Sequence, residues 1–248
     1  YAPELRIEQT EVEIVYQRVK SALNSDRIVV HYQPIQTISS EQIHHYEALV
    51  SMYDEEGTLI MPAEIIPVAE KFNIVTQIDY KVMRLVLEQL SFLRKDHPEI
   101  SISVNLSGKH IGDINLYELI QSDMNKHNID FANLIFEITE TAALENVAAA
   151  REFMNKLILS GCRFALDDFG VGFTSFAQLR TLPVYIIKID GMFIRELDTN
   201  YQDQVFVKAM TDVAHSMGKK VVAEFVENEN ILKLLKKLGV DYAQGYHI

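Results

Sequence analysis

Acidic, amide and amine side chains recur near the carboxyl ends of short apolar runs along this chain of 248 residues. They are Gln33, Glu47, Asn105, Glu137, Glu140, Asp167, Asp168, Lys188, Asp190, Glu224, Glu227 and Gln244. Carboxylates that converge on one rim repel one another unless a cation lies among them. Oxygen ligands, without a cysteine cluster or a well-placed histidine pair, favour Mg²⁺ or Mn²⁺ over Zn²⁺. The adjacent acids Asp167 and Asp168 suit a second ion, so the pattern indicates a two-metal hydrolytic site.

A structural explanation competes with this one at each single position. A lone acid at a strand end serves about as often as a helix N-cap or a solvated loop residue. Lys188 could be only a structural partner of Asp190, because a cation inside an acidic rim also satisfies charge neutrality. The joint occurrence of polar residues at most of the strand ends favours a shared site.

Short β-branched runs alternate with helical patterns and would position these residues. The predicted strands are Ile28–Gln33, His45–Val50, Ile100–Asn105, Leu134–Glu140, Arg163–Asp168, Tyr185–Asp190, Lys220–Glu224 and Tyr242–Tyr246. Helices between them include Ala63–Phe72, Asp79–Leu93, Asn146–Leu159, Gln204–Met217 and Asn228–Leu238. The order predicts an α/β fold, a modified TIM (β/α)8 barrel, whose strand ends share the rim that carries active sites. Ile35–Gln42 is too short for a crossover helix, so the first two strands form a hairpin and one barrel strand is antiparallel.

Alternation along the strands predicts which side chains face the inside of the barrel. In Ser101–Asn105 the small polar residues share a face with Asn105, which therefore points inward. The same parity places Lys188 and Asp190 together inside the barrel and the neighbouring isoleucines outside.

Composition limits the classes of partner. The chain has 35 acidic and 23 basic residues, a net charge of −12, which argues against bulk binding of DNA or of an anionic membrane. No apolar run approaches the roughly 18 residues of a membrane span, and the single cysteine, Cys162, excludes an intrachain disulfide. We expect a cytoplasmic protein, or the cytoplasmic part of a larger, membrane-anchored one. Residues 1–27 form a linker whose helix, Glu8–Asn24, caps the domain 28–248 or connects it to an upstream domain.

Eight short motifs follow one another in an order that is specific as a set. They are Tyr32-Gln33-Pro34, Glu47-Ala48-Leu49, Asn105-Leu106-Ser107, Glu137-Ile138-Thr139-Glu140, Asp167-Asp168-Phe169-Gly170, Lys188-Ile189-Asp190, Ala223-Glu224 and Gln244-Gly245-Tyr246. In these motifs the chain resembles the EAL domain family of cyclic di-GMP phosphodiesterases, from Ile28 to the end. The resemblance implies a Mg²⁺- or Mn²⁺-dependent barrel, with two ions, that opens cyclic di-GMP to the linear dinucleotide pGpG by attack of a metal-bound water.

The resemblance also implies a role for each matching residue. The first metal would be held by Glu47, Asn105, Glu137 and Asp167, and the second by Asp167 and Asp168. Glu47, Lys188 and Glu224 match catalytic positions. Lys188 matches the lysine that contacts the attacking water and the phosphate, and Glu224 matches the acid that orients water or a metal ligand. Substrate-binding positions are Gln33, Ser51, Asp190 and Gln244. Glu140 matches the acid that holds a loop coupling a homodimer interface to metal binding.

Three positions depart from the family's pattern, and none is a predicted metal ligand. Ser51 stands where an arginine usually meets a substrate phosphate, so we expect weaker substrate binding. Val171 replaces a hydroxyl residue in the loop after Asp168, and Phe225 replaces a glycine, with a side chain expected to face outward.

The same motifs leave two other functions open. One is a receptor that binds cyclic di-GMP without cleaving it, although this chain keeps the Glu47 and Asp167-Asp168 motifs that receptor-type members commonly lose. The other is an interaction domain that binds no nucleotide. An upstream sensor or GGDEF domain is expected in the full-length chain, whereas this segment is expected to contact neither DNA nor a membrane.

Overall fold

Eight strands close into a barrel in the computed structural model, which describes residues 2–127, 129–171 and 179–248. They are β1 (Ile28–Thr37), β2 (Ile43–Tyr53), β4 (Ser101–Asn105), β5 (Leu134–Thr139), β6 (Arg163–Phe169), β7 (Ile186–Ile189), β8 (Lys220–Ala223) and β9 (Tyr242–Gln244). Strand β1 is antiparallel to both β2 and β9, and the remaining ring pairs are parallel. The predicted barrel with one antiparallel strand is confirmed. The two-residue β3 (Leu59–Ile60) pairs with β2 outside the ring.

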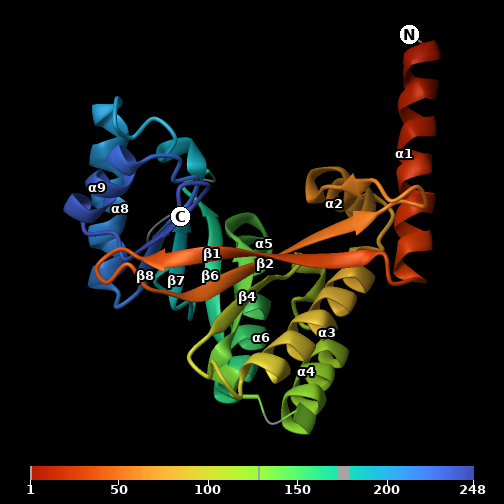
Figure 1. Cartoon of the computed structure of the whole chain (residues 1–248), viewed down its shortest axis with the longest axis horizontal. Helices are drawn as coiled ribbons and strands as arrows, with labels where there is room; N and C mark the ends of the chain where they lie inside the picture. Colours follow the sequence, from red (N-terminus) through yellow and green to blue (C-terminus); the bar gives the residue numbers. More distant parts are fainter. Residues whose placement is uncertain (1, 128, 172–178) are drawn as a thin grey trace.

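Helices cover the outside of the barrel (Figure 1). They are α2 (Pro62–Lys71), α3 (Val75–Leu93), α4 (Ile114–His127), α5 (Glu140–Glu145), α6 (Val147–Leu159), α8 (Tyr201–Ser216) and α9 (Glu229–Leu238). Asparagine caps begin three of them, because the side chains of Asn146, Asn200 and Asn228 accept bonds from backbone N–H groups of the first turn. Both α2 and α3 follow the hairpin, as predicted, whereas α4 and α5 were not among the predicted helices.

The β1–β2 hairpin is longer than its sequence pattern indicated. Its pairing extends from Ile28 opposite Met52 to Gln36 opposite Ile43. The open end of this ribbon reaches past the barrel toward α2 and the N-terminal helix α1 (Ala2–Leu23) (Figure 1). The side chains on one face of this ribbon therefore point into the barrel at one end, and the same row of side chains continues past the rim at the other end.

Helix α1 begins at Ala2, earlier than the predicted Glu8, because the polar residues before its apolar stripe are also good helix formers. Val19 and Ala22 are buried, and Tyr16 stacks on Phe72 at the end of α2 with ring centroids 4.2 Å apart. None of the helices in the described ranges is long and apolar enough to cross a bilayer.

The core has two layers, as the alternation predicted. A small cluster fills the inside of the barrel and comprises Ile35, Ile135, Ala165, Ile186 and Val222. A larger cluster lies between strands and helices and includes Ile187 and Ile189, so these isoleucines do face outward. Beyond the inner cluster, toward the carboxyl ends of the parallel strands, the next inward-facing side chains are polar, and these residues form the site.

Candidate functional site

The rim above the inner cluster carries most of the residues that the sequence singled out. Strands and strand ends bring together Gln33, Glu47, Asn105, Glu137, Asp167, Lys188, Glu224 and Gln244 through the contacts described below. Four of these residues and their neighbour Asp168 carry carboxylates, and Lys188 carries the amine that pairs with them. We call Glu47, Glu137, Asp167, Asp168 and Glu224 the carboxylate cage.

Lys188 lies at the centre of the carboxylate cage and is only 1% exposed. Its Nζ is 2.6 Å from Glu137, 2.8 Å from Glu224, 3.0 Å from Glu47 and 3.2 Å from Asp167. Burial works against the charged amine, but the surrounding carboxylates outweigh it and raise the pKa of Lys188 well above its usual value. The lysine is therefore a cation shared by four acids.

Asp190 is not the ion-pair partner of Lys188. Its side chain accepts the backbone N–H of Met192 at 2.8 Å and so caps a short 3-10 helix, Gly191–Phe193. Strand β7 ends at Ile189, before the predicted end, so Asp190 lies beyond the ladder; its charge still acts on Asp168 of the cage and helps to raise the pKa of that residue.

Amide side chains orient Glu47 from two sides. Asn105 Nδ2 donates to Glu47 Oε1 at 2.6 Å, and Gln244 Nε2 donates to Glu47 Oε2 at 2.6 Å and to Gln33 Oε1 at 2.9 Å. Burial alone would raise the pKa of Glu47, but the charge of Lys188 and these amide bonds lower it. Glu47 is thus held as an ionised carboxylate.

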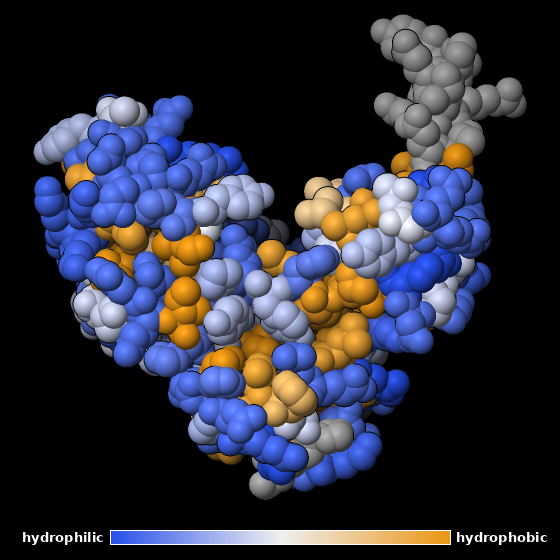
Figure 2. All heavy atoms as spheres, viewed as in Figure 1, coloured by the Kyte–Doolittle hydropathy of each residue, from blue (hydrophilic) through white to orange (hydrophobic). Residues whose placement is uncertain are grey.

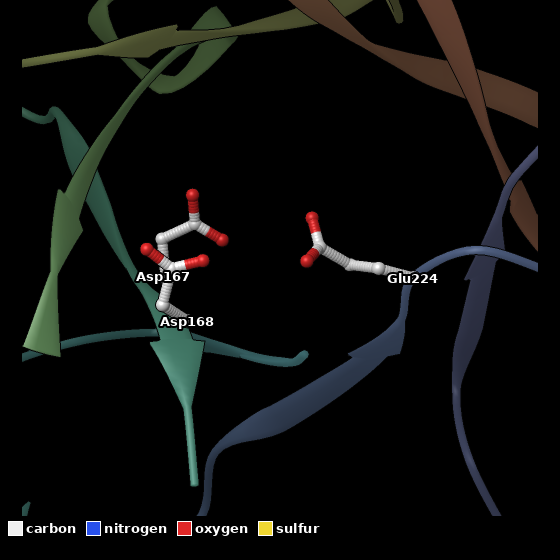
Figure 3. Close-up of side chains that lie close together, drawn as sticks. All are labelled: Asp167, Asp168 and Glu224. Atoms are coloured by element: carbon white, nitrogen blue, oxygen red, sulfur yellow. The ribbon is translucent and has the colours of Figure 1, made fainter. Parts of the chain in front are cut away.

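A break in strand β6 turns two neighbouring acids toward the same ligand space. Adjacent strand residues normally point to opposite faces, but Asp168 has a φ of +55° and the β6–β7 register shifts between Leu166 and Phe169. Oxygens of Asp167, Asp168 and Glu224 consequently lie within 4.8 Å of one another (Figure 3). A left-handed aspartate is backbone strain of the kind found at functional sites.

The electrostatics of the cage fit a divalent cation. Burial and the charge of Glu47 raise the pKa of Glu137 to about 8, and burial raises the pKa of Glu224 to about 7. Burial, then the charge of Asp167, raises the pKa of Asp168. Glu137 Oε1 and Gln244 Oε1 are buried without a hydrogen-bond donor among the described residues. Oxygen ligands with mutual repulsion and unused lone pairs are a donor set for Mg²⁺ or Mn²⁺.

Glu140 anchors the backbone that follows β6. It is the first residue of α5, and its Oε2 accepts the N–H of Gly170 at 3.0 Å. Gly170 has a φ of +103°, a conformation that favours glycine. The contact joins α5 to the segment after Asp168, and the coupling to a dimer interface stays a prediction.

Two of the departures from the family pattern take unexpected places. Ser51 is 1% exposed, so its hydroxyl does not reach open ligand space. Phe225 follows the end of β8 with a φ of +54° and lines a cavity beside Glu224, under the guanidinium of Arg195 at 3.9 Å. The expectation that Phe225 faces outward is wrong, because strand alternation no longer holds once the ladder has ended at Ala223. Val171 is exposed, which agrees with a loop position.

Two cavities of similar size flank the carboxylate cage. The first, about 260 Å³, is lined mainly by aliphatic side chains of β2, α2 and α3 and reaches Asn105 and Glu137. The second, about 240 Å³, is lined by Gln33, Glu47, Leu49, Glu224, Phe225, Gln244, Gly245 and Tyr246. Leu49 lines both. Figure 2 shows a notch in this face of the molecule, between the part that carries α8 and α9 and the part that carries α2.

A buried histidine network beside the first cavity was missed by the sequence analysis. His110 is fully buried, with Nε2 3.2 Å from Asp79 and Nδ1 3.1 Å from Asp113, and the Tyr80 hydroxyl donates to Asp113 at 2.8 Å. Asp79 lines the cavity and accepts the N–H of Ser107, two residues after Asn105. The only signal was a histidine three residues before an aspartate, which is too common to interpret.

This network makes a prediction about stability. Burial opposes a charge on His110, but the bonds and charges of Asp79 and Asp113 prevail and raise its pKa. A raised folded-state pKa stabilises the fold fully below the unfolded value of about 6.5, and the stabilisation is lost as pH rises through the folded value. At mildly acidic pH, His110→Ala is expected to lower the free energy of unfolding by about 3 kcal/mol, since it removes the buried cation between Asp79 and Asp113.

Denaturant unfolding of both forms across the pH range checks this prediction. The unchanged chain should lose stability relative to His110→Ala as pH rises, so the gap between the two curves should narrow, leaving the cost of the cavity that the buried ring filled. His97→Ala, which changes an exposed histidine, is the control. A difference that does not depend on pH would mean that His110 is neutral in the fold.

Fold and site together define a class: a modified (β/α)8 barrel whose rim carries a carboxylate cage around a buried lysine. A model of the EAL domain family matches residues 16–248. Cyclic di-GMP phosphodiesterase PdeB of Shewanella oneidensis is 38% identical over 93% of this chain and 27% of its own length, and PdeF of Escherichia coli is 35% identical over 93% and 31%. The solved structure of the PaMucR phosphodiesterase with c-di-GMP superposes with a TM-score of 0.88, at 30% identity over 94% of both chains.

The chain belongs to the EAL domain family, as the sequence motifs indicated. It spans about a third, or less, of the length of the two relatives named above.

Proposed function

We propose that this domain is a metal-dependent phosphodiesterase that hydrolyses cyclic di-GMP to linear pGpG in bacterial second-messenger signalling. The observation that carries the proposal is the complete carboxylate cage, with Lys188 inside it and a cavity on each side. The names of the relatives and the ligand of the PaMucR structure support the choice of substrate.

The two cavities suit a ligand with two similar halves. Their volumes are about 260 and 240 Å³; the first borders Glu137 of the cage, the second borders Glu47 and Glu224, and Leu49 lines both. A cyclic dinucleotide carries one base on either side of its phosphodiester linkages. With one base in each cavity, a phosphodiester lies over the cage.

Residues of the cage take separate roles in the proposed reaction. Glu47, Asn105, Glu137 and Asp167 would hold one ion, and Asp167 with Asp168 a second. Two divalent ions bound there would lower the pKa of a water molecule and neutralise charge on the phosphoryl oxygens. Lys188 keeps the acids in place and donates to the phosphate region, while the Glu224 carboxylate, 2.8 Å from Lys188 Nζ, orients the water and accepts its proton.

Substrate binding involves the residues around the second cavity. Gln33 and Gln244 present amides to it, and Asp190 lies after β7 at the same rim. Ser51 carries no positive charge and is buried, so the phosphate contact that an arginine makes in the family is weakened here.

The context of the domain is also proposed from the family. It acts in the cytoplasm as a homodimer, with Glu140 linking its loop to the interface, and α1 connects it to an upstream sensor or GGDEF domain. The greater length of the relatives supports additional domains in the full-length chain.

Turnover of cyclic di-GMP by the purified chain tests the proposal. With Mg²⁺ or Mn²⁺, chromatography should show linear pGpG, and a chelator should abolish its formation until the metal is restored in excess. Calorimetry that shows binding without cleavage in either metal would indicate a receptor instead. Absence of both binding and cleavage would indicate an interaction domain.

A further inference from the structure

The β1–β2 ribbon presents a row of side chains to the site, and this row continues beyond the carboxylate cage. Gln33 lies directly opposite Glu47, and both side chains bond to Gln244. The next pair outward on the same face is His31 opposite Leu49, because side chains repeat every second residue along a strand. Leu49 lines both cavities, so His31 lies on the ribbon face that borders them, and its side chain is exposed.

The proposed ligand needs positive charge that the cavity walls do not supply. A cyclic dinucleotide carries two phosphates, and only one of them can be attacked over the cage at a time. Of the described residues, no arginine, lysine or histidine lines either cavity. Lys188 is buried among four carboxylates, and the nearby Lys109 donates to Asn73 Oδ1 at 2.9 Å. Arg195 stacks on Phe225 at the second cavity, but its guanidinium already pairs with Glu227, with Nη1 3.7 Å from Oε1. The second phosphate therefore lacks a cationic partner in the walls.

His31 is a basic side chain that the register places on the face of the ribbon that borders the cavities. It lies directly across from Leu49 and diagonal to Glu47 and Ser51, and diagonal side chains on paired strands are about 7–8 Å apart. Ser51, which the sequence singled out for a phosphate contact, is buried, whereas His31 is free to approach a ligand. An exposed imidazole can donate an N–H to a phosphate oxygen, and does so most strongly when protonated.

We infer that His31 binds the phosphate of the cyclic dinucleotide that is not being cleaved. The inference rests on the proposed function and adds a substrate-binding residue to it. It also explains how a chain with serine at position 51 retains a side-chain contact to the second phosphate.

Steady-state kinetics with two substrates tests the inference. For cyclic di-GMP, His31→Ala is expected to raise KM roughly 10- to 100-fold, the loss typical of one charge-assisted hydrogen bond, with kcat within about threefold. For bis(p-nitrophenyl) phosphate, which has a single phosphate, kcat/KM should stay unchanged. His31→Lys should keep KM for cyclic di-GMP near that of the unchanged chain, since lysine restores a positive donor.

The matched control is His44→Ala, on β2 of the same hairpin but on the opposite face. It removes an exposed histidine that does not face the cavities and should leave KM unaltered. An unchanged KM in His31→Ala, or an equal loss on both substrates, would overturn the inference while leaving the phosphodiesterase proposal intact. If the unchanged chain neither binds nor cleaves cyclic di-GMP, the proposed function fails and the role of His31 fails with it.

Discussion

Glu47→Ala is expected to lower kcat/KM for cyclic di-GMP by roughly 10³-fold or more, because it removes a proposed metal ligand and an anchor for three other groups at once. Glu47 accepts bonds from Asn105, Gln244 and Lys188 at 2.6, 2.6 and 3.0 Å. Without its carboxylate, the Asn105 amide, the buried Gln244 amide and the Lys188 ammonium group each lose an acceptor, and the proposed first ion loses a charged ligand.

The measurement is turnover at saturating Mn²⁺, together with calorimetric titration of the metal. Glu47→Gln keeps the shape but not the charge, and it should also lose activity and bind the metal more weakly. Glu152→Gln, which changes an exposed glutamate on α6, serves as the control and should behave like the unchanged chain. Normal activity in both Glu47 variants would show that this residue is not a ligand.

The barrel could be predicted because its strands are buried on both faces. Continuous β-branched runs at regular spacing indicate parallel strands, and the short link after the first run requires a hairpin. Alternation also predicted which side chains of the regular strands face the inside of the barrel. Asn105 and Lys188 both point inward, as predicted. Periodicity is a local property, so sequence reasoning succeeds wherever the ladder stays regular.

Alternation gives no direction for side chains where the ladder stops or breaks. Asp190, Glu224 and Phe225 follow the last paired residues of their strands, so their directions depend on turn geometry that alternation does not describe. Asp168 reaches the site through a left-handed backbone and a register shift, which depend on neighbouring strands and on the following segment. The His110 network joins α3 to the loop after β4, and such long-range pairs leave no spacing pattern in the sequence.

These irregular places are where the chemistry is concentrated. A regular strand would aim Asp167 and Asp168 in opposite directions, and only one could approach Glu224. The left-handed conformation at Asp168 costs of order 1 kcal/mol or more, yet it brings a third carboxylate next to Asp167 and Glu224. Bringing these carboxylates together therefore requires an irregular strand, and the strain of that irregularity has to be offset by the stability of the rest of the barrel.

Lys188→Met is expected to make the stability of the fold depend on divalent metal. Without Lys188, four carboxylates lose their shared cation, and breaking such buried pairs lowers the free energy of unfolding by about 3–5 kcal/mol when no metal is present. Added Mn²⁺ should restore much of that loss, because a ligand that binds only the folded state stabilises it. Turnover should not return, since the metal cannot replace the hydrogen bond that Lys188 is proposed to donate to the phosphate.

Thermal unfolding with chelator and with saturating Mn²⁺ measures this effect. The shift in Tm on adding metal should be larger for Lys188→Met than for the unchanged chain. Lys219→Met is the matched control, because Lys219 is also buried but donates to the neutral carbonyl oxygens of Leu182 and Val184, each at 2.9 Å. Its loss should lower Tm equally with and without metal. Equal metal shifts in both variants would mean that Lys188 and the divalent ions do not stabilise the same carboxylates.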